Sequence, residues 1–261
     1  MALDPLFFDL PDTVPVGGTT YPAETVLDVL GRYLTDERRA RLEAVIAARA
    51  FGVVPVMEAL IDPGNVNAVL RSAEGLGFGA AHVVALEGTA ATLVEQIDDE
   101  DAGVVDDRRA VRRASQGAHK WVEVRAWDDA RAYVDHVHAL GGRVAVTALR
   151  DDARPIAEWD FSAPTALVVG NEHAGASDAM VEAADAAILL PMDGFVQSYN
   201  VSVAAAMALA HARADRLART GRHADLDPDL QRRLLAHYVA RAVPLAAPLL
   251  AEHARREGAS L

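Results

Sequence analysis

Short apolar runs alternate with longer stretches whose apolar residues have helical spacing. The runs predict strands at residues 53–57, 81–86, 121–124, 143–149, 166–169 and 186–190. The longer stretches predict helices at 65–76, 128–140, 177–184 and 197–219. Continuous apolar strands that alternate with helices are typical of a mostly parallel sheet covered on both faces, so we predict an α/β fold flanked by helices. Ligands of such folds bind beyond the carboxyl ends of the strands, which directs attention to the loops after Thr147, Val169 and Leu190.

The two ends of the chain are patterned differently from its middle. Residues 1–34 are rich in Pro and Gly and predict an N-terminal extension with a short helix near 23–32. Thr35 is placed to cap the next helix. A last helical segment from Pro228 to about 255 contains Pro244 and Pro248, which should kink or break it. We therefore expect three parts: residues 1–34, a central domain at 35–220, and a C-terminal helical extension at 221–261.

Charge is unevenly distributed in this chain of 261 residues, whose net charge is −13. That average argues against a nucleic-acid partner, because Lys and Arg drive phosphate binding. Residues 87–107 predict an acidic loop with eight carboxylates and no basic residue, and a basic, helix-like stretch follows at 108–116. The basic positions that are candidates for RNA contact are Arg38, Arg41, Arg112, Arg113 and Lys120. The alternative interpretation is that these clusters are solvated helix faces.

Several classes of protein are disfavoured by composition. The chain has no cysteine, which excludes disulfides and thiolate metal sites. No cluster of other metal ligands is present, since His136 and His138 are two apart on a predicted helix and do not share a face. The N-terminus lacks the basic region of a signal peptide, and the longest apolar runs, at 202–210 and 242–251, are too short to span a bilayer. We expect a cytoplasmic protein without metal or membrane partner.

Three segments contain residue types that packing alone does not require. Residues 62–74 read DPGNVNAVLRSAE, residues 167–175 read LVVGNEHAG, and residues 190–204 read LPMDGFVQSYNVSVA. Each has a structural alternative: Asn65 or Asn200 caps a helix, and Gly170 serves a turn. In this order and spacing, however, the segments resemble the three motifs of the SpoU/TrmH branch of the SPOUT methyltransferases, over roughly residues 35–220.

The resemblance implies an RNA ribose 2′-O-methyltransferase that uses S-adenosylmethionine and no metal. It also implies a C-terminal trefoil knot and a homodimer whose active sites lie at the subunit interface. Within the family, the tRNA guanosine 2′-O-methyltransferases are most similar, on the basic helix before the first motif and the added C-terminal helices. The same chemistry on ribosomal RNA is the alternative, although 34 N-terminal residues are too few for the separate RNA-binding domain that ribosomal members often have.

Matching the motifs position by position assigns expected roles to individual residues. Arg71 matches the catalytic arginine, and the other polar motif positions are Asn65, Glu172, Ser198 and Asn200. The expected cofactor-binding residues are Thr147, Gly170, Leu190, Met192 and Tyr199. The family role of this arginine is to activate the ribose hydroxyl. A guanidinium stays protonated in proteins, which argues against a free general base. The alternative is a phosphate-assisted proton transfer, in which Arg71 fixes the phosphate and stabilises the developing alkoxide. For the other four polar positions, support of the site and direct contact with substrate remain equal alternatives.

The chain departs from the family pattern at two motif positions and in one acidic segment. Tyr199 stands where the family usually has Leu, and Asn67 replaces a small residue. The acidic segment 87–107 would repel phosphate unless it points away from RNA or steers it.

A non-catalytic RNA-binding protein on the same scaffold is disfavoured because the polar motif positions are retained. A dinucleotide-binding dehydrogenase is rejected, since the glycines at 75–79 follow a helix instead of a strand.

Overall fold

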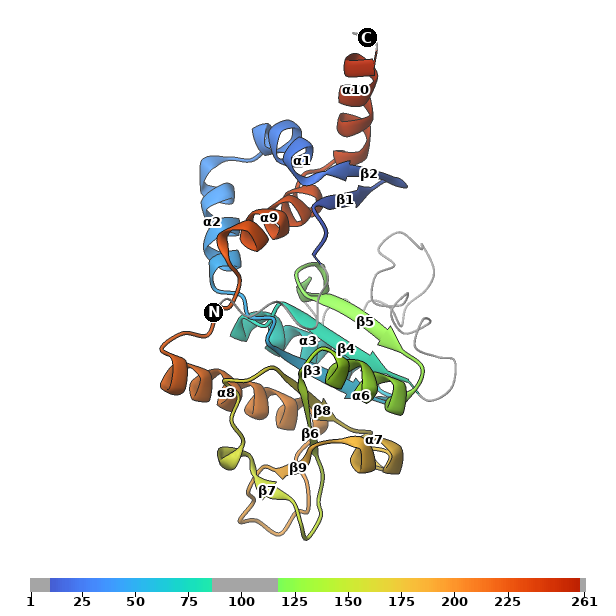
Figure 1. Cartoon of the computed structure of the whole chain (residues 1–261), viewed down its shortest axis with the longest axis vertical. Helices are drawn as coiled ribbons and strands as arrows, with labels where there is room; N and C mark the ends of the chain where they lie inside the picture. The colour runs from blue at the N-terminus through green and yellow to red at the C-terminus, as the bar shows by residue number, and fades with distance from the viewer. Residues whose placement is uncertain (1–9, 86–116, 259–261) are drawn as a thin grey trace. The chain divides into compact units, whose positions relative to one another are not determined.

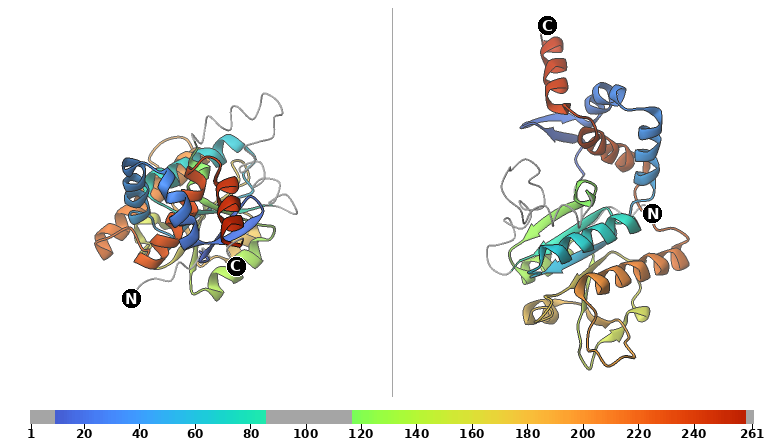
Figure 2. Two further views of the ribbon diagram at one scale, coloured as in Figure 1. Left: turned by 90° about the horizontal axis from the view of Figure 1, so that it is seen from above. Right: turned by 180° about the vertical axis from the view of Figure 1, so that it is seen from behind.

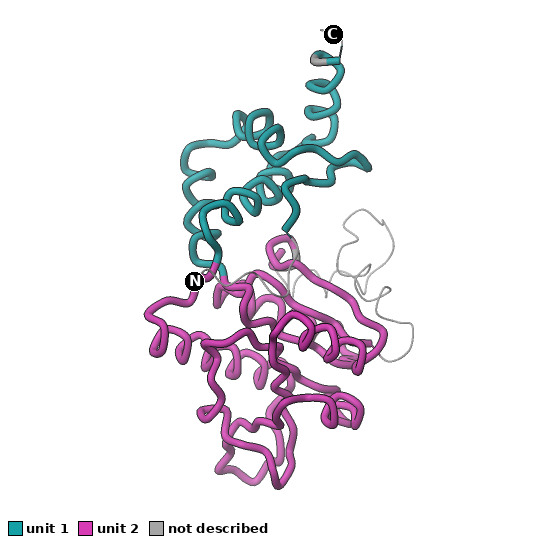
Figure 3. Tube along the Cα trace, viewed as in Figure 1, with its two compact units in different colours: residues 1–2, 9–49, 226–261 teal, residues 3–8, 50–225 magenta. Residues whose placement is uncertain are grey.

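The computed structural model describes residues 10–85 and 117–258. They fall into two compact units, shown in Figure 3: residues 10–49 with 226–258, and residues 50–85 with 117–225. The predicted acidic loop at 87–107 and basic helix at 108–116 lie outside the described residues.

The larger unit is built on a seven-stranded sheet in the order β5-β4-β3-β8-β6-β9-β7, and every pairing is parallel. Its strands are β3 (Val53–Glu58), β4 (Ala80–Val84), β5 (Glu123–Trp127), β6 (Arg143–Thr147), β7 (Arg154–Pro155), β8 (Thr165–Val169) and β9 (Ala186–Leu189). The predicted parallel α/β sheet is confirmed. All residues of β3, β4 and β8 are buried, which explains why these strands are continuous apolar runs. The two-residue strand β7 was not predicted, because two residues carry no periodicity.

Helices cover both faces of this sheet (Figures 1 and 2). One face carries α3 (Pro63–Leu76) and α8 (Val201–Thr220), which pack on each other, and the other carries α6 (Ala130–Ala139) and α7 (Asp178–Ala183). Two short 3-10 helices, η2 (Ala118–Lys120) and η3 (Ile156–Glu158), join these elements. The prediction that the long helix starts near residue 197 is wrong: α8 starts at Val201, because the Asn200 side chain caps it.

The smaller unit combines both ends of the chain. A hairpin, β1 (Thr13–Val16) and β2 (Thr19–Pro22), leads into α1 (Ala23–Leu30), η1 (Gly31–Tyr33) and α2 (Asp36–Ala47). The C-terminal helices are α9 (Pro228–Ala242) and α10 (Ala246–Gly258). The predicted short helix is present as α1, whereas the hairpin was not predicted; its turn depends on two glycines with positive φ.

Packing divides the chain differently from the boundaries expected at residues 34/35 and 220/221. Helix α2 packs against α9, with Leu42 and Ile46 buried, so it groups with the terminal segments instead of the central domain. The predicted break in the last helix occurs at Pro244, between α9 and α10, whereas Pro248 lies in the first turn of α10, where it is tolerated. No single described helix is long and apolar enough to cross a membrane; α9 and α10 satisfy length and composition only together, and they are bent by 111°.

Candidate active site

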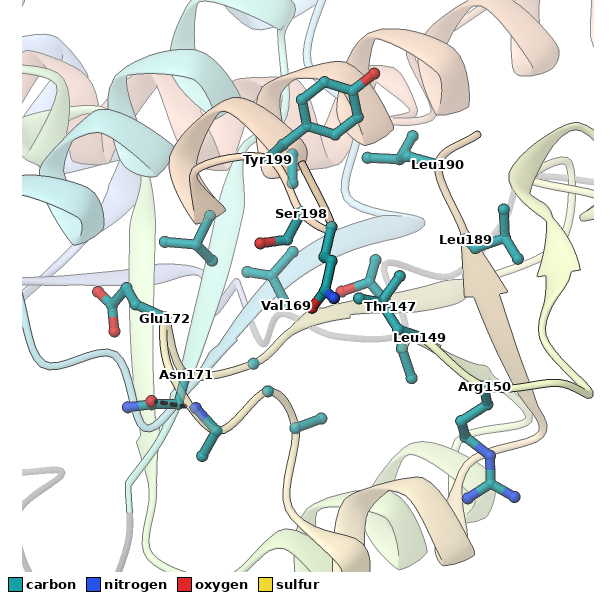
Figure 4. Close-up of a pocket in the computed structure, with 18 of the residues that line it drawn as sticks. Thr147, Leu149, Arg150, Val169, Asn171, Glu172, Leu189, Leu190, Ser198 and Tyr199 are labelled. Carbon is teal, nitrogen blue, oxygen red and sulfur yellow. Dashed lines mark hydrogen bonds between the residues drawn. The ribbon is translucent and has the colours of Figure 1, made fainter. Parts of the chain in front are cut away.

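A cavity of about 590 Å³ opens beyond the carboxyl ends of β6, β8 and β9 (Figure 4). Three loops line it, and they are the ones that follow Thr147, Val169 and Leu190 in the sequence. Parallel strands bring their carboxyl ends to one edge of the sheet, so loops far apart in the sequence meet there. A cavity of this size is in the range of small-molecule and cofactor sites, which is about 300–1,000 Å³.

All five predicted cofactor-binding positions line the cavity: Thr147, Gly170, Leu190, Met192 and Tyr199. The Thr147 hydroxyl donates to the carbonyl of Val168 at 3.0 Å, which ties β6 to β8 at the cavity floor. Tyr199 replaces the family's usual Leu, and its hydroxyl finds a partner in the carbonyl of Pro191 at 3.4 Å. Figure 4 shows Tyr199 and Asn171 on opposite walls. The substitution therefore keeps a large side chain at the wall and links the two ends of one lining loop.

The loop after β8 folds back tightly on itself. Asn171 and Gly175 exchange two backbone hydrogen bonds of 2.9 Å, and the Asn171 side-chain oxygen accepts from the backbone amides of His173 and Ala174. A Cβ at Gly170 would lie only 2.1 Å from the backbone nitrogen of Ala176. Gly170 is therefore required by close backbone approach, and Asn171 organises the turn.

Polar side chains from all three motifs meet at one end of this cavity. The Asn65 side chain donates to a carboxylate oxygen of Glu172 at 2.9 Å, and its own oxygen accepts from the Asn200 side chain at 3.3 Å. Glu172 also accepts from the backbone amides of Ile61 and Asp62 at 3.3 and 3.4 Å. Glu172 and Arg150 lie at opposite ends of the cavity (Figure 4). The carboxylate thus orients the Asn65 side chain and two backbone amides, and among the described residues Arg71 is not one of its partners.

The hydrogen bonds around Glu172 keep it ionised. Burial alone would raise the pKa of Glu172, but the hydrogen bonds that it accepts, first of all from Asn65, outweigh burial and hold this pKa below its ordinary value. The carboxylate is therefore negatively charged near neutral pH, and the Asn65 amide group is fixed with its NH₂ toward Glu172 and its oxygen toward Asn200.

Two of the remaining motif residues have structural roles. Asn200 is the N-cap of α8, and its oxygen accepts from the backbone amides of Ser202 and Val203, so the capping alternative applies alongside its contact with Asn65. Asn67 is buried and donates to the carbonyl of Pro63, within its own helix. Ser198, by contrast, is exposed and lines the cavity. Its hydroxyl is available to a bound molecule.

The structure does not bring Arg71 into the cavity. Arg71 lies on α3, about a turn and a half after Asn65, and is exposed; among the described residues its guanidinium has no ion pair or hydrogen bond. Of the predicted RNA contacts, Arg38 and Arg41 are exposed on α2 and Lys120 is exposed in η2, while Arg112 and Arg113 lie outside the described residues. Arg39, next to Arg38, donates to the carbonyl of Gly31, and Arg49, which follows the end of α2, is buried, so neither belongs to a solvated helix face.

The sequence patterns did not identify Asn171, which lines the cavity, or Glu58 and Ser177, which lie outside its lining. Glu58 is a carboxylate at the end of an otherwise apolar strand and is only 1% exposed. Its position in the strand was a usable signal, since buried carboxylates require partners. The partner, Ser177, is 119 positions away in the sequence and only the fold identifies it.

Comparison with known proteins agrees with this geometry. The model of the SpoU rRNA methylase family matches residues 52–210, which contain all three motifs. The chain belongs to the SpoU family. This SpoU-family chain is 36% identical over 210 residues to the tRNA (guanosine(18)-2′-O)-methyltransferase of Thermus thermophilus, covering 80% of the chain and 98% of that protein. It is 30% identical to the enzyme of the same name from Escherichia coli, over 69% of the chain and 70% of that protein.

Solved structures of the family share the fold. The TrmH/SpoU tRNA modifying enzyme of A. aeolicus superimposes with a TM-score of 0.65 at 25% identity, covering 80% of this chain and 98% of that one. The SpoU methyltransferase AviRb from Streptomyces viridochromogenes, solved in complex with AdoMet, has a TM-score of 0.50 at 26% identity, covering 63% of this chain and 60% of that one.

Proposed function

We propose that the protein transfers a methyl group from S-adenosylmethionine to a ribose 2′-hydroxyl of a guanosine in tRNA. The observation that carries this proposal is the convergence of Asn65, Glu172 and Asn200, from three separate motifs, at the rim of a cavity of cofactor size. The substrate follows from relatives named as tRNA (guanosine(18)-2′-O)-methyltransferases that match nearly their full length.

The cavity suits an adenosyl group in size and in chemistry. Apolar side chains, among them Val169, Leu190 and Met192, provide faces for a purine ring, and the surrounding loops offer backbone amides and carbonyls. When bound there, S-adenosylmethionine supplies an electrophilic methyl carbon on a sulfonium sulfur. No group of His, Asp or Glu side chains suited to a metal ion occurs among the described residues.

The chain's own residues must align and activate the ribose. Its 2′-oxygen gains the methyl carbon and loses its proton, while the donor sulfur keeps the electron pair of the broken bond. Asn65, Ser198 and Asn200 lie where side-chain hydrogen bonds can orient the ribose. Arg71 stays protonated, and its exposed guanidinium is free to pair with an RNA phosphate. Fixing that phosphate beside the hydroxyl both offers a proton acceptor and stabilises the developing alkoxide.

We further propose a homodimer in which the chain is knotted through the cavity loops. A set of exposed apolar side chains supports a second copy as the partner: Phe195, Val196, Val203 and Met207, in the loop after β9 and on one face of α8. An apolar face of this kind is self-complementary in a two-fold dimer. A dimer also brings a second Arg71 to the assembly. We place the enzyme in the cytoplasm, where tRNA is modified.

Ribosomal RNA is the second candidate substrate. The chain is 34% identical to the 23S rRNA (guanosine(2553)-2′-O)-methyltransferase of Bacillus subtilis, over 61% of the chain and 57% of that protein. The tRNA assignment is preferred because the match to the Thermus relative covers 80% of this chain and 98% of that protein, against 61% and 57% for the ribosomal relative.

Methylation of defined RNAs tests the proposal. Purified protein is incubated with labelled S-adenosylmethionine and either unmodified tRNA or rRNA fragments, and ribose methylation is mapped. We expect label at a guanosine of tRNA. Arg71→Ala should reduce transfer at least a hundredfold and leave cofactor affinity unchanged, whereas Arg131→Ala, at an exposed arginine on α6, should behave as wild type. Label confined to rRNA would refute the substrate, and normal transfer by Arg71→Ala would refute the role of the guanidinium.

A further inference from the structure

The loop at residues 170–176 is held from behind by the end of strand β3. Every residue of this loop lines the cavity. At its far side the buried Glu58 carboxylate accepts two hydrogen bonds from Ser177, one from the hydroxyl at 2.6 Å and one from the backbone amide at 3.0 Å. At its near side the Asn171 side chain donates to the carbonyl of Ala59 at 2.8 Å. The last residue of β3 and the residue that follows it therefore anchor both ends of the loop.

The Glu58–Ser177 contact is more demanding than an ordinary surface hydrogen bond. Glu58 is only 1% exposed, and among the residues that the structure describes Ser177 is its one hydrogen-bonding partner. A buried carboxylate without donors is strongly disfavoured, so the Glu58 side chain constrains Ser177 to remain within reach. The Ser177 hydroxyl also accepts from the backbone amide of Met180 and so caps α7. Its hydrogen is directed to Glu58 and its oxygen to the helix.

The backbone of Ala59, which follows Glu58, also holds the loop in place. Ala59 has a φ of +52°, a conformation that residues other than glycine rarely adopt. In this conformation its amide donates to the carbonyl of Val84 on β4, and its carbonyl accepts from Asn171. Ala59 thus links strand β4 to the loop after β8, and this connects the loop to the middle of the sheet.

We propose that Glu58 is a positioning residue for cofactor binding, which acts through Ser177 to hold residues 170–176 in their binding conformation. This inference rests on the proposed function, because it assumes that the cavity takes S-adenosylmethionine. Glu58 is absent from the cavity lining, so it acts on a molecule in the cavity only through other residues. If the loop must be ordered before the donor binds, weakening the anchor lowers the fraction of competent protein and raises the apparent Kd in proportion.

Three variants separate this role from general stability. Glu58→Gln keeps the shape of the side chain and leaves the α7 cap in place, but exchanges a carboxylate for a weaker, neutral partner. Ser177→Ala removes both the anchor and the cap, and Ser177→Thr restores the hydroxyl. Asp129→Ala is the matched control: it deletes the cap of α6, where the carboxylate accepts from the Ala132 amide at 2.6 Å, far from the loop in the chain.

The experiment measures two quantities on the full-length protein. Calorimetry gives the Kd for S-adenosylhomocysteine, and hydrogen exchange of the cofactor-free protein gives the opening of amides at 170–176. We expect the Kd to rise about fivefold in Glu58→Gln and about tenfold in Ser177→Ala, with faster exchange in the loop, and to stay within twofold of wild type in Ser177→Thr and Asp129→Ala. The KM for S-adenosylmethionine should rise with the Kd, while the KM for tRNA stays constant.

Different outcomes overturn different claims. An unchanged Kd and unchanged loop exchange in Glu58→Gln would refute the positioning role, as would an equal loss of affinity in Asp129→Ala. Failure of the wild-type protein to bind S-adenosylhomocysteine would instead refute the proposed function. The exchange measurement needs no ligand, so it tests the anchor in either case.

Discussion

Replacing Gly170 with alanine tests how strictly the tight loop determines cofactor binding. The added Cβ would lie 2.1 Å from the nitrogen of Ala176 and 2.3 Å from the carbonyl carbon of Gly175. Ordinary contact begins at 3.4 Å, so the 175–176 backbone must move by about 1.3 Å. Both obstructing atoms belong to the main chain, so no side-chain rotation relieves the clash.

That displacement has a calculable consequence. Moving residue 175 breaks the two 2.9 Å backbone hydrogen bonds with Asn171. Each such bond contributes about 0.5–1.5 kcal/mol, so the binding conformation of the loop is disfavoured by about 1–3 kcal/mol. We therefore expect the Kd for S-adenosylmethionine to rise by about 5- to 150-fold, since about 1.4 kcal/mol corresponds to a factor of ten.

Calorimetric titration with S-adenosylhomocysteine provides the assay, and a thermal melt verifies folding. Gly75→Ala is the matched control, because Gly75 is exposed on α3 and an added Cβ meets nothing within 4 Å. Alanine in a helix is more favourable than glycine, so this variant should bind normally and melt at the same or a higher temperature. Affinity of Gly170→Ala within twofold of wild type would refute the argument from backbone crowding.

The remaining predictions concern stability and assembly. Burial, assisted by nearby arginines, lowers the pKa of His223 to about 4, so between about pH 6.5 and 4 the unfolded chain binds one more proton at this residue than the folded chain does. The free energy of unfolding should therefore fall as the pH decreases through this window, and His223→Phe should flatten that slope. Burial raises the pKa of Asp225, but Asp225 is present in both proteins, so comparing the variant with the wild type cancels its contribution. Asp225→Ala leaves the buried Arg216 without the carboxylate that lies 3.0 Å away, and should lower the free energy of unfolding in urea by about 3–5 kcal/mol. Glu252→Ala, at an exposed ion pair with Arg256, should lower it by less than about 1 kcal/mol. Equal losses in the two variants would contradict the distinction between buried and exposed pairs. Met207→Arg should lower the oligomer mass seen by light scattering if α8 forms the dimer face, and an unchanged mass would exclude that face.

The pattern of apolar residues predicted the central strands of the sheet well and its edge strands poorly. Strands β3, β4 and β8 are buried on both faces, so their continuous apolar runs were unambiguous. Strand β5 starts two residues later than predicted, and β7 was missed, because edge strands are exposed on one side and carry weaker patterns. The hairpin at 13–22 was not predicted, because Pro and Gly are frequent in irregular segments as well as in hairpin turns.

The sequence alone determined the family, the three motif segments and the edge of the sheet where they meet. These are consequences of residue type and spacing: strand and helix periods are local, and loops that follow parallel strands share one edge. Only the tertiary structure decided which side chains pair. The Glu172–Asn65 contact spans 107 positions and the Glu58–Ser177 contact spans 119, and no local period encodes a partner at such a distance. Arg71 shows the converse, since its motif is evident in the sequence, yet packing on α3 leaves it exposed and outside the cavity of its own chain.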